Sequence, residues 1–392
     1  MSFFHSLPLL PPDLIFGLNS AYQQDPHPHK IKVLIVFYKN VELKTPVMHA
    51  VKAAEKRLLE KETTKEYLPL DGDPLFLEEV KKLIFSEKCP LFLYGAQSVG
   101  GTGALRILGE FLHKTLFREI YIPELSWPVH ETLFTKAGFI VEKYPYYNRG
   151  TNQVDFDRIY SFFTSLPEKS CIVLHAACHN PTGVDFSKKE WEELSSLFLI
   201  KGFFAFFDAA YQGFHKGLSE DCFAIRLFLE KGIECAVASS FSKNFSLYGE
   251  RTGALFIATK EKGSLSSIAS QIKVLIRCSY SNPPRHGAAI VREILLDSFL
   301  KKSWEEELKG MRERIAKMRR DLAKAFSIKL QKDLTYLAEG AGLFAFTGLN
   351  STQVESLQKR GIYMTLDGRM NVTSCNEQNM DIFVNAVGDA LL

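Results

Sequence analysis

The sequence contains no apolar run long enough to cross a membrane, and its charges of opposite sign nearly balance. The most apolar stretch, Gly202-Phe-Phe-Ala-Phe-Phe207, is followed at once by Asp208 and falls far short of the ~20 residues that a membrane-spanning helix needs. The chain has 48 Lys and Arg against 45 Asp and Glu, which leaves a formal net charge of +3. That charge is too small to hold nucleic acid or an anionic membrane nonspecifically, so we expect neither as a partner.

Cysteine is scarce, and its positions follow no metal-binding pattern. The seven cysteines are odd in number and contain neither a Cys-x-x-Cys pair nor a Cys/His zinc spacing, so the sequence predicts no metal site. A reduced cytosol is the natural compartment for such a chain. The N-terminal residues lack a basic region and are soon interrupted by Pro11-Pro12-Asp13, a pattern that does not predict a signal peptide. We therefore expect a cytoplasmic protein.

The remaining composition is that of a soluble globular chain. With 392 residues, of which 46% are apolar and 24% charged, the chain can bury roughly three quarters of its unfolded surface without disulfides or metals. Between about residues 90 and 260, short β-rich runs alternate with longer amphipathic ones, which predicts an α/β sheet with helices on its faces. The candidate strands are residues 119–123, 139–144, 171–176, 203–208, 235–239 and 253–259.

Two helices can be placed from local signals, and the second suggests a domain boundary. Ser187-Lys-Lys-Glu190 reads as a capping box and predicts a helix that runs to about residue 200. Residues 301–326 carry apolar side chains at three- and four-residue steps. We place a boundary near the start of this second helix. The expected organisation is a large domain of residues 45–300 and a small α/β domain built from residues 1–44 and 301–392.

A glycine-rich segment precedes an amphipathic stretch. Ser98-Val-Gly100-Gly101-Thr102-Gly103 leads into a predicted helix over residues 104–113, whose free N–H groups and helix dipole suit an anion such as phosphate. A tight strand-to-helix turn without a ligand is an equally good interpretation. The segment is not a Walker loop, and Arg106 stands where a dinucleotide-binding fingerprint needs its last glycine.

An isolated acid follows the apolar strand at residues 203–208. Asp208 is delivered to the carboxyl end of that strand, where an ionised group is costly unless a cation or a strong donor meets it. A helix cap or an arginine partner would explain it. The alternative is a heteroaromatic cofactor whose ring nitrogen must stay protonated. Tyr211 can point the same way if the chain turns into a helix there.

A lysine surrounded by hydroxyl groups follows another predicted strand. Lys243 comes after Ser239, Ser240 and Ser242, and Arg251 follows eight residues later. Such a lysine is often a surface side chain, but it can also form a Schiff base when nearby cations and burial lower its pKa. The turn sequence Asn180-Pro-Thr-Gly183 also ends a strand, at the edge where open α/β sheets bind ligands.

These motifs occur in the order found in one family of enzymes. The set resembles the fold-type I pyridoxal-phosphate aminotransferases of class I, and more narrowly their aspartate/aromatic branch, from about Leu14 to the C-terminus. That resemblance implies a large domain with a mostly parallel sheet flanked by helices, plus a small α/β domain. The motifs that carry it are Lys65-Glu-Tyr67-Leu-Pro-Leu, Cys178-His-Asn-Pro-Thr-Gly183, Asp208-Ala-Ala-Tyr-Gln-Gly-Phe214, Ser242-Lys-Asn-Phe-Ser-Leu-Tyr-Gly-Glu-Arg251 and Tyr280-Ser-Asn-Pro-Pro284.

The resemblance implies pyridoxal 5′-phosphate as cofactor and assigns contacts to it. Lys243 would attach it as a Schiff base and then move the substrate's α-proton, while Asp208 would keep the ring nitrogen protonated. Asn180 and Tyr211 would donate hydrogen bonds to the ring oxygen O3′, and Trp127 would stack on the ring. The phosphate would be held by Gly101, Thr102, Ser240, Ser242 and Arg251, joined by Tyr67 from a neighbouring subunit.

The resemblance also implies how substrate would bind. Arg369 would grip the α-carboxylate by a bidentate pair, and Arg277 would reach across the interface of a homodimer with shared active sites to a distal carboxylate. Trp127 and Asn180 would line the same pocket, and His175 would lie behind Asp208. The chain departs from the family at Val36-Phe-Tyr38, where a glycine is usual in place of Val36, so substrate preference is less firmly implied than cofactor chemistry.

Three functions follow from these features. The first is transfer of an amino group from aspartate, an aromatic amino acid or both to 2-oxoglutarate; the retention of both Arg277 and Arg369 favours it. The second is a pyridoxal-phosphate enzyme of another type, such as a lyase, which would release ammonia or pyruvate. The third, a nucleotide-binding α/β protein, would need the dinucleotide fingerprint that Arg106 interrupts.

Overall fold

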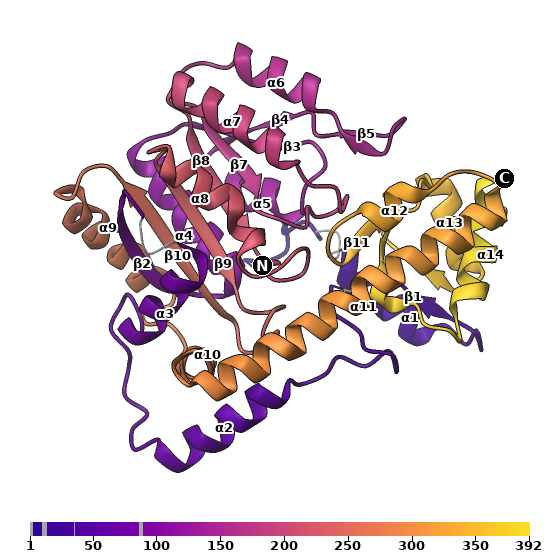
Figure 1. The fold of residues 1–392 in the computed structure, drawn as a ribbon, viewed down its shortest axis with the longest axis horizontal. Coiled ribbons are helices and arrows are strands. Elements are labelled where there is room, and N and C mark those ends of the chain that lie inside the picture. The colour runs from indigo at the N-terminus through magenta and orange to yellow at the C-terminus, as the bar shows by residue number, and fades with distance from the viewer. Residues whose placement is uncertain (1–2, 10–13, 35, 86–88) are drawn as a thin grey trace.

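A seven-stranded sheet forms the centre of the molecule (Figure 1). Within the described residues, every neighbouring pair of its strands is parallel except the two pairs made by the strand over Thr252–Thr259. The expected α/β architecture with a mostly parallel sheet is therefore confirmed. In spatial order the strands are β2 (Phe92–Val99), β10 (Thr252–Thr259), β9 (Cys235–Ser240), β8 (Phe204–Ala209), β7 (Cys171–His175), β3 (Glu119–Pro123) and β4 (Ile140–Tyr144).

The structure is a computed structural model that describes residues 3–9, 14–34, 36–85 and 89–392. Pro11-Pro12-Asp13 and part of the expected 1–44 segment lie outside the described residues. The six strands predicted from the sequence are all present to within one residue at each end. The strand β2 was not predicted, because Tyr94-Gly-Ala-Gln97 breaks the β-rich pattern that marks the others.

Helices cover both faces of the sheet, which explains why its strands are apolar throughout. Phe206 of β8 belongs to the core between the sheet and the helices α4, α5 and α9, whereas its neighbour Phe207 belongs to the core on the opposite face. Successive side chains of a strand point to opposite faces, so a strand buried on both sides reads as a continuous apolar run. The helices that cover the two faces of the sheet are α4 (Gly100–Thr115), α5 (Val129–Ala137), α6 (Phe156–Ser165), α7 (Lys188–Lys201), α8 (Phe223–Glu230), α9 (Ser264–Ser279) and α10 (Arg285–Leu296).

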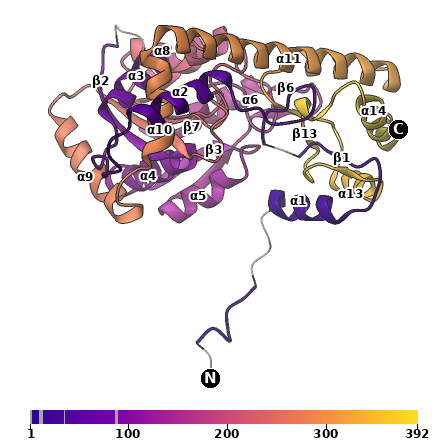
Figure 2. The ribbon, with the colours of Figure 1, turned by 90° about the horizontal axis from the view of Figure 1, so that it is seen from below.

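The predicted capping box and the predicted long helix are both present. Ser187 accepts the N–H of Glu190 at the start of α7, and the Glu190 carboxylate accepts the N–H of Ser187. The long helix α11 spans Ser298–Leu330 and runs from the sheet towards the C-terminal residues (Figures 1 and 2). The expected boundary at residue 300 lies in the first turn of α11, and the division into two domains stays a prediction.

A second group of elements packs around the far end of α11, and we call it the carboxyl-terminal lobe. It consists of residues 14–34 and 331–392 (Figure 1). Two small sheets build it, because β1 pairs in parallel with β12 and β11 pairs antiparallel with β13. Its elements are α1 (Leu14–Gln24), β1 (Ile31–Lys32), α12 (Thr335–Glu339), β11 (Phe344–Phe346), α13 (Ser351–Lys359), β12 (Ile362–Tyr363), β13 (Arg369–Asn371), η2 (Val372–Ser374) and α14 (Met380–Leu391).

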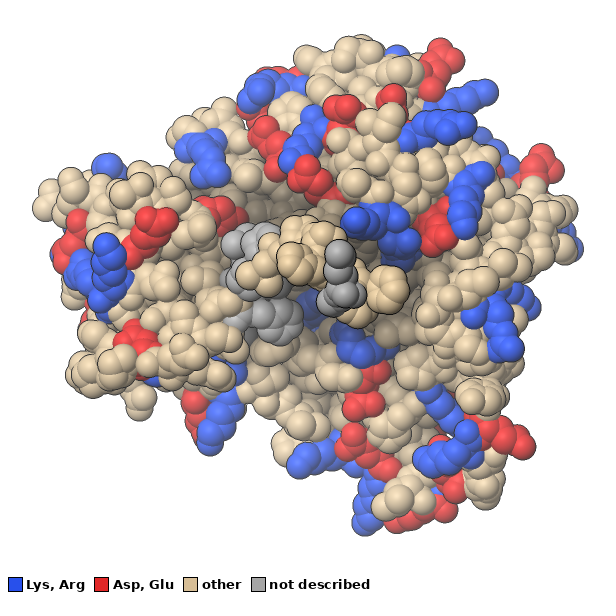
Figure 3. Space-filling view, turned by 180° about the vertical axis from the view of Figure 1, so that it is seen from behind, with Lys and Arg blue, Asp and Glu red and all other residues tan. Residues whose placement is uncertain are grey.

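The remaining elements lie at the periphery. They are α2 (His49–Lys61), α3 (Pro74–Ile84), the short hairpin of β5 (Tyr147–Asn148) and β6 (Gln153–Val154), and η1 (Glu220–Cys222). Basic and acidic side chains are interspersed over the face shown in Figure 3, as the small net charge predicts. Among the described helices, none has the length and apolar character to cross a bilayer.

Candidate active site

The chemistry-bearing residues follow the carboxyl ends of three adjacent parallel strands. His175 at the end of β7 is in register with Asp208 of β8, and Ala209 of β8 is in register with Ser239 of β9. Lys243 follows β9 by three residues. Because β7, β8 and β9 are neighbours, their carboxyl ends lie side by side at one edge of the sheet, and this is the edge where open α/β sheets bind ligands.

The glycine-rich segment is not a loop but the first turn of a helix. The structure starts α4 at Gly100, four residues before the predicted start, because Gly100 adopts a φ of +67° and turns the chain directly from β2 into the helix. A Cβ on Gly100 would lie 2.6 Å from a guanidinium nitrogen of Arg251. A Cβ on Gly101 would lie 3.0 Å from the Cβ of Ser240. Glycine therefore lets the N-terminus of α4 approach Arg251 and Ser240 closely.

Hydroxyl groups also surround Arg251, next to the N-terminus of α4. The Arg251 guanidinium donates to Ser242 Oγ at 3.3 Å and to the Tyr248 carbonyl at 3.0 Å, and no carboxylate pairs with it among the described residues. Ser240 Oγ accepts the N–H of Ser242 at 3.3 Å, and Thr102 is exposed in the first turn of α4. A cation without an acidic partner, next to a helix N-terminus and hydroxyl groups, suits a phosphate dianion.

Asp208 is buried, and histidines surround it. Its side chain is 9% exposed, and its Oδ2 lies 3.1 Å from Nε2 of the fully buried His130. Ser126 Oγ connects His130 to His175, at 2.7 Å from His130 Nδ1 and 3.3 Å from His175 Nε2. Burial by itself would raise the pKa of Asp208, but the hydrogen bond and charge of His130 hold that pKa below its usual value. Asp208 is thus a buried carboxylate kept in its anionic form.

The sequence analysis missed His130 and placed only His175 behind Asp208. His130 lies in α5, 78 residues from Asp208, and its spacing to the acid carries no sequence signal. Burial lowers the pKa of His175 to about 4, so that its imidazole is neutral at physiological pH. One ring nitrogen each of His130 and His175 and one carboxylate oxygen of Asp208 lie within 4.8 Å of one another, and these three atoms could also ligate a metal ion. Since Ser126 and the carboxylate already engage the ring nitrogens, we interpret the three as a hydrogen-bonded cluster.

Lys243 lies over the Tyr211 ring and interacts electrostatically with Asp208. Its Nζ is 4.9 Å from the centre of the Tyr211 ring. The pKa of Lys243 is lowered to about 8, mainly because the amine is buried; Asp208 acts in the opposite direction, and Arg251 adds to the lowering. A lysine with such a pKa has an appreciable neutral fraction near pH 7, which is the form that attacks a carbonyl carbon.

Asn180, Tyr211 and Arg369 form a connected group beside this lysine. Asn180 Nδ2 lies 3.5 Å from the Tyr211 hydroxyl, and Arg369 donates to Asn180 Oδ1 at 3.0 Å. Arg369 is 2% exposed, and its guanidinium lies 4.4 Å from the ring centre of Phe344. The chain after β8 forms turns, with Gly213 at a φ of +92°, and not the helix considered for Tyr211. Tyr211 nevertheless lies beside Lys243 and Asn180, at the same edge of the sheet as Asp208.

Three of the predicted site residues lie apart from this group. Tyr67 is 90% exposed, and Arg277 is exposed on α9, where it donates to Ser281 Oγ at 2.6 Å. Neither makes a hydrogen bond or ion pair with Lys243 or Asp208 among the described residues of the single chain. Trp127 is partly buried and meets His130 edge-on, with ring centres 5.4 Å apart.

The unusual segment around Val36 lies next to Arg369. The Leu34 carbonyl accepts from Arg369 at 3.4 Å, and the Tyr38 N–H donates to the Tyr248 hydroxyl at 2.9 Å. Val36 is partly buried against the core, and Phe37 packs edge-on against Tyr248 at 4.7 Å. An effect of Val36 on the pocket stays a prediction.

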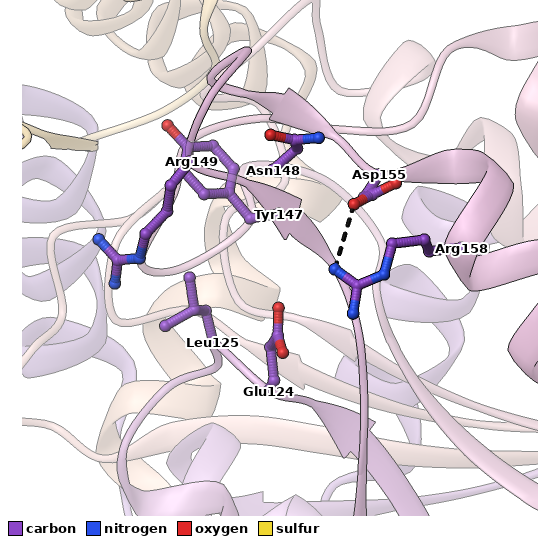
Figure 4. Close-up of a pocket in the computed structure, with 7 residues that line it drawn as sticks. All are labelled: Glu124, Leu125, Tyr147, Asn148, Arg149, Asp155 and Arg158. Carbon is purple, nitrogen blue, oxygen red and sulfur yellow. Dashed lines mark hydrogen bonds and ion pairs between the residues drawn. The ribbon is translucent and has the colours of Figure 1, made fainter.

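A separate surface cavity shows that pocket shape alone does not identify this site. A cavity of about 470 Å³ lies beside the β5–β6 hairpin (Figure 4). Arg158 donates to Asp155 there at 3.4 Å, and none of the predicted site residues lines the cavity. The candidate site is therefore defined by its buried charges and hydrogen bonds.

Comparisons with known proteins agree with the geometry. The family model "Aminotransferase class I and II" matches residues 35–387. An aspartate aminotransferase of Pseudomonas aeruginosa is 39% identical over 398 aligned residues, which cover 100% of both chains. An aromatic-amino-acid aminotransferase of the same organism is 39% identical over 394 residues, covering 99% of this chain and 98% of that protein.

A solved structure is similar over the whole chain. It is the crystal structure of the aromatic-amino-acid aminotransferase from Burkholderia pseudomallei covalently bound to pyridoxal phosphate. The TM-score is 0.96 at 39% identity, and the match covers 100% of both chains.

Proposed function

Because this chain belongs to the class I and II aminotransferases, we propose that it moves the amino group of aspartate, an aromatic amino acid or both to 2-oxoglutarate. The products would be glutamate and the matching 2-oxo acid. The protein is a pyridoxal 5′-phosphate-dependent aminotransferase. The lyase and nucleotide-binding alternatives are not favoured. The observation that carries the proposal is the electrostatic interaction of Lys243 with the buried, anionic Asp208, together with the buried cation Arg369.

The residues present fit the cofactor at both of its ends. The cradle of Gly100, Gly101 and Arg251, which a Cβ would fill, would hold the phosphate together with Thr102, Ser240 and Ser242. Asp208, held anionic by His130, would accept a hydrogen bond from the protonated ring nitrogen. Asn180 and Tyr211 would contact the ring oxygen, and Trp127 would cover one ring face. When bound, pyridoxal phosphate supplies an electron sink for the α-carbon of the amino acid.

The protein's own groups then bind the substrate and move one proton. Arg369 would pair with the α-carboxylate through two parallel N–H···O bonds, because Asn180, Phe344 and the Leu34 carbonyl already fix its guanidinium plane. The neutral Lys243 amine would take the proton from the substrate's α-carbon and deliver it to the C4′ atom of the cofactor, which is the net proton shift that transamination requires.

The second half of the substrate site is proposed to come from a partner subunit. Arg277 and Tyr67 are exposed on the single chain, which supports a homodimer in which both residues complete the site of the other protomer. A second cation there would suit the distal carboxylate of aspartate or 2-oxoglutarate. We also propose a cytoplasmic location, supported by seven cysteines that are all unpaired.

Two measurements test this function. A panel of amino donors with 2-oxoglutarate, read for glutamate, ammonia and pyruvate together, should give glutamate with aspartate or an aromatic donor. Release of ammonia without glutamate would contradict the proposal. Borohydride reduction and peptide mapping should place a pyridoxyl group on Lys243, and a label on another lysine would overturn the residue assignment.

A further inference from the structure

Arg319 is a buried cation that no part of the proposed chemistry uses. It lies in α11 and is 2% exposed. Its guanidinium donates to the carbonyls of Gly342 at 3.0 Å, Leu337 at 3.0 Å and Ala341 at 2.7 Å, and also to that of Phe344. No carboxylate pairs with it among the described residues. A planar fork that binds four carbonyls fixes the backbone between residues 337 and 344, which we call the Arg319 turn.

The Arg319 turn is pressed against the loop that carries Asn180. The N–H of Ala341 donates to the Gly183 carbonyl at 2.6 Å. A Cβ on Gly183 would lie 2.1 Å from the Phe344 carbonyl and 2.5 Å from Arg319 Nη2. A Cβ on Gly342 would lie 2.5 Å from the Cβ of Cys178. The carboxyl-terminal lobe and the loop after β7 therefore meet at contact distance, with Arg319 between them.

The Arg319 turn ends at Phe344, whose ring packs against the guanidinium of Arg369. The Phe344 ring lies 4.4 Å from the Arg369 guanidinium and 6.0 Å from the Tyr211 ring. On the other side of the contact, Asn180 stands three residues before Gly183 and accepts from Arg369 at 3.0 Å. Both partners of the Asn180–Arg369 hydrogen bond are thus held by backbone that Arg319 organises.

We propose that Arg319 is a positioning residue that sets the spacing between Arg369 and Asn180, and thereby how tightly the site holds the α-carboxylate of any amino acid. The inference rests on the roles proposed above for these two residues. Every amino acid substrate carries the α-carboxylate, so the loss of Arg319 weakens the binding of aspartate and of phenylalanine alike. It also affects the resting holoenzyme, because a displaced Asn180 withdraws a hydrogen-bond donor from the cofactor's ring oxygen.

The test uses three variants with matched controls. Arg319→Met removes all four hydrogen bonds, and Arg319→Lys keeps the charge but not the planar fork. Gly340→Ala keeps Arg319 but adds a Cβ that would lie 2.3 Å from its Nη1 and 2.8 Å from the Gly183 carbonyl oxygen, so it disturbs the contact between the Arg319 turn and the loop that carries Asn180; its φ of −64° is one that alanine adopts without strain. Arg320→Met makes the same change at the next, exposed position of α11, and Gly310→Ala adds a Cβ with no neighbour within 4 Å.

Three readouts are compared: KM and kcat for aspartate and phenylalanine, the pH midpoint of the visible absorbance of the resting holoenzyme, and the thermal midpoint of the apoenzyme. We expect Arg319→Met and Gly340→Ala to raise KM for both donors by a similar factor of about 10 or more, with kcat changed less than about threefold. The absorbance midpoint of both variants should rise by about half a pH unit. For Arg319→Lys, KM and the absorbance midpoint should lie between those of these two variants and those of wild type. Both controls should match wild type.

The outcomes separate this inference from the proposed function. If Arg319→Met does not fold, Gly340→Ala and Arg319→Lys carry the test, because both retain the buried cation. Variants that lose thermal stability while their KM and absorbance midpoint match the controls would show a purely structural role and overturn the inference. A wild-type enzyme that does not transaminate would refute the proposed function, whereas an active wild type with unaffected variants would refute the role of Arg319 alone.

Discussion

Replacing Asp208 by asparagine should separate the charge of this residue from its shape. The Asp208 side chain is 9% exposed, and His130 holds its pKa low, so the native group is anionic. A carboxylate in contact with a protonated ring nitrogen about 3.5 to 4 Å away gains about 4 to 5 kcal/mol at an effective dielectric constant of ~20. At 1.36 kcal/mol per decade, Asp208→Asn should lower kcat about 1,000-fold, while KM changes little because the substrate is held elsewhere.

The assay is steady-state kinetics of glutamate formation, with cofactor saturation checked by absorbance. Asp208→Glu retains the charge at a shifted position, so its kcat should fall by less than about 30-fold. If both variants lose less than tenfold, or lose the same amount, Asp208 is a structural cap and the assignment of the ring nitrogen is wrong.

The same residue predicts a pH dependence of stability. Because the folded-state pKa of Asp208 is depressed, its charge stabilises the fold above the unfolded pKa of about 3.9, and this contribution is lost as pH falls through the folded value. The apoenzyme of Asp208→Asn should therefore be less stable than wild type at pH 7. That deficit should shrink below about pH 4 in denaturant titrations, and a constant deficit would contradict the linkage.

Three further predictions concern the other charged groups. Arg369→Leu should lower kcat/KM for aspartate and phenylalanine alike, whereas Arg277→Leu should lower that for aspartate at least ~100-fold and that for phenylalanine less than tenfold; equal losses in the second variant would assign Arg277 to the fold or the interface. With aspartate as donor, mixing Lys243→Ala chains with Arg277→Ala chains, each nearly inactive with that donor, should restore up to one competent site per heterodimer; failure after confirmed subunit exchange would place Arg277 in its own chain's site. Lys243→Met should make the apoenzyme more stable at pH 7 by about 1 to 3 kcal/mol, because wild type keeps a lysine whose folded pKa of about 8 lies below the usual lysine value of 10.5; denaturant unfolding should show this gain shrinking between pH 8 and 10.5.

The parts of the fold that depend on local patterns were predictable from the sequence. The strand over residues 119–123 and the capped helix after Ser187 follow from side chains next to one another in the chain. The strand β2 was not, since its apolar residues alternate irregularly and its place at the sheet's edge is fixed by pairing with β10. Long-range pairing of this kind leaves no mark within the strand itself.

Some residues of the candidate site could likewise be predicted from the sequence, and others could not. Lys243 and Asp208 could be singled out because each stands alone in an apolar or hydroxyl-rich context at a strand end. His130 and Arg319 could not, because each acts on groups brought near only by folding: His130 on a side chain 78 residues away, and Arg319 on backbone carbonyls, which every sequence has. A sequence motif cannot predict such contacts, because the partner is determined by the fold and not by the type of residue.

The most direct test of the central claim is a single half-reaction. Holoenzyme is mixed with excess aspartate, and separately with phenylalanine, in the absence of any 2-oxo acid, and the released products are counted per active site. An aminotransferase retains the amino group, so at least one of these donors should give about one 2-oxo acid per site, no free ammonia and no further turnover until 2-oxoglutarate is added. Continuous release of ammonia or of product without an acceptor would contradict transamination.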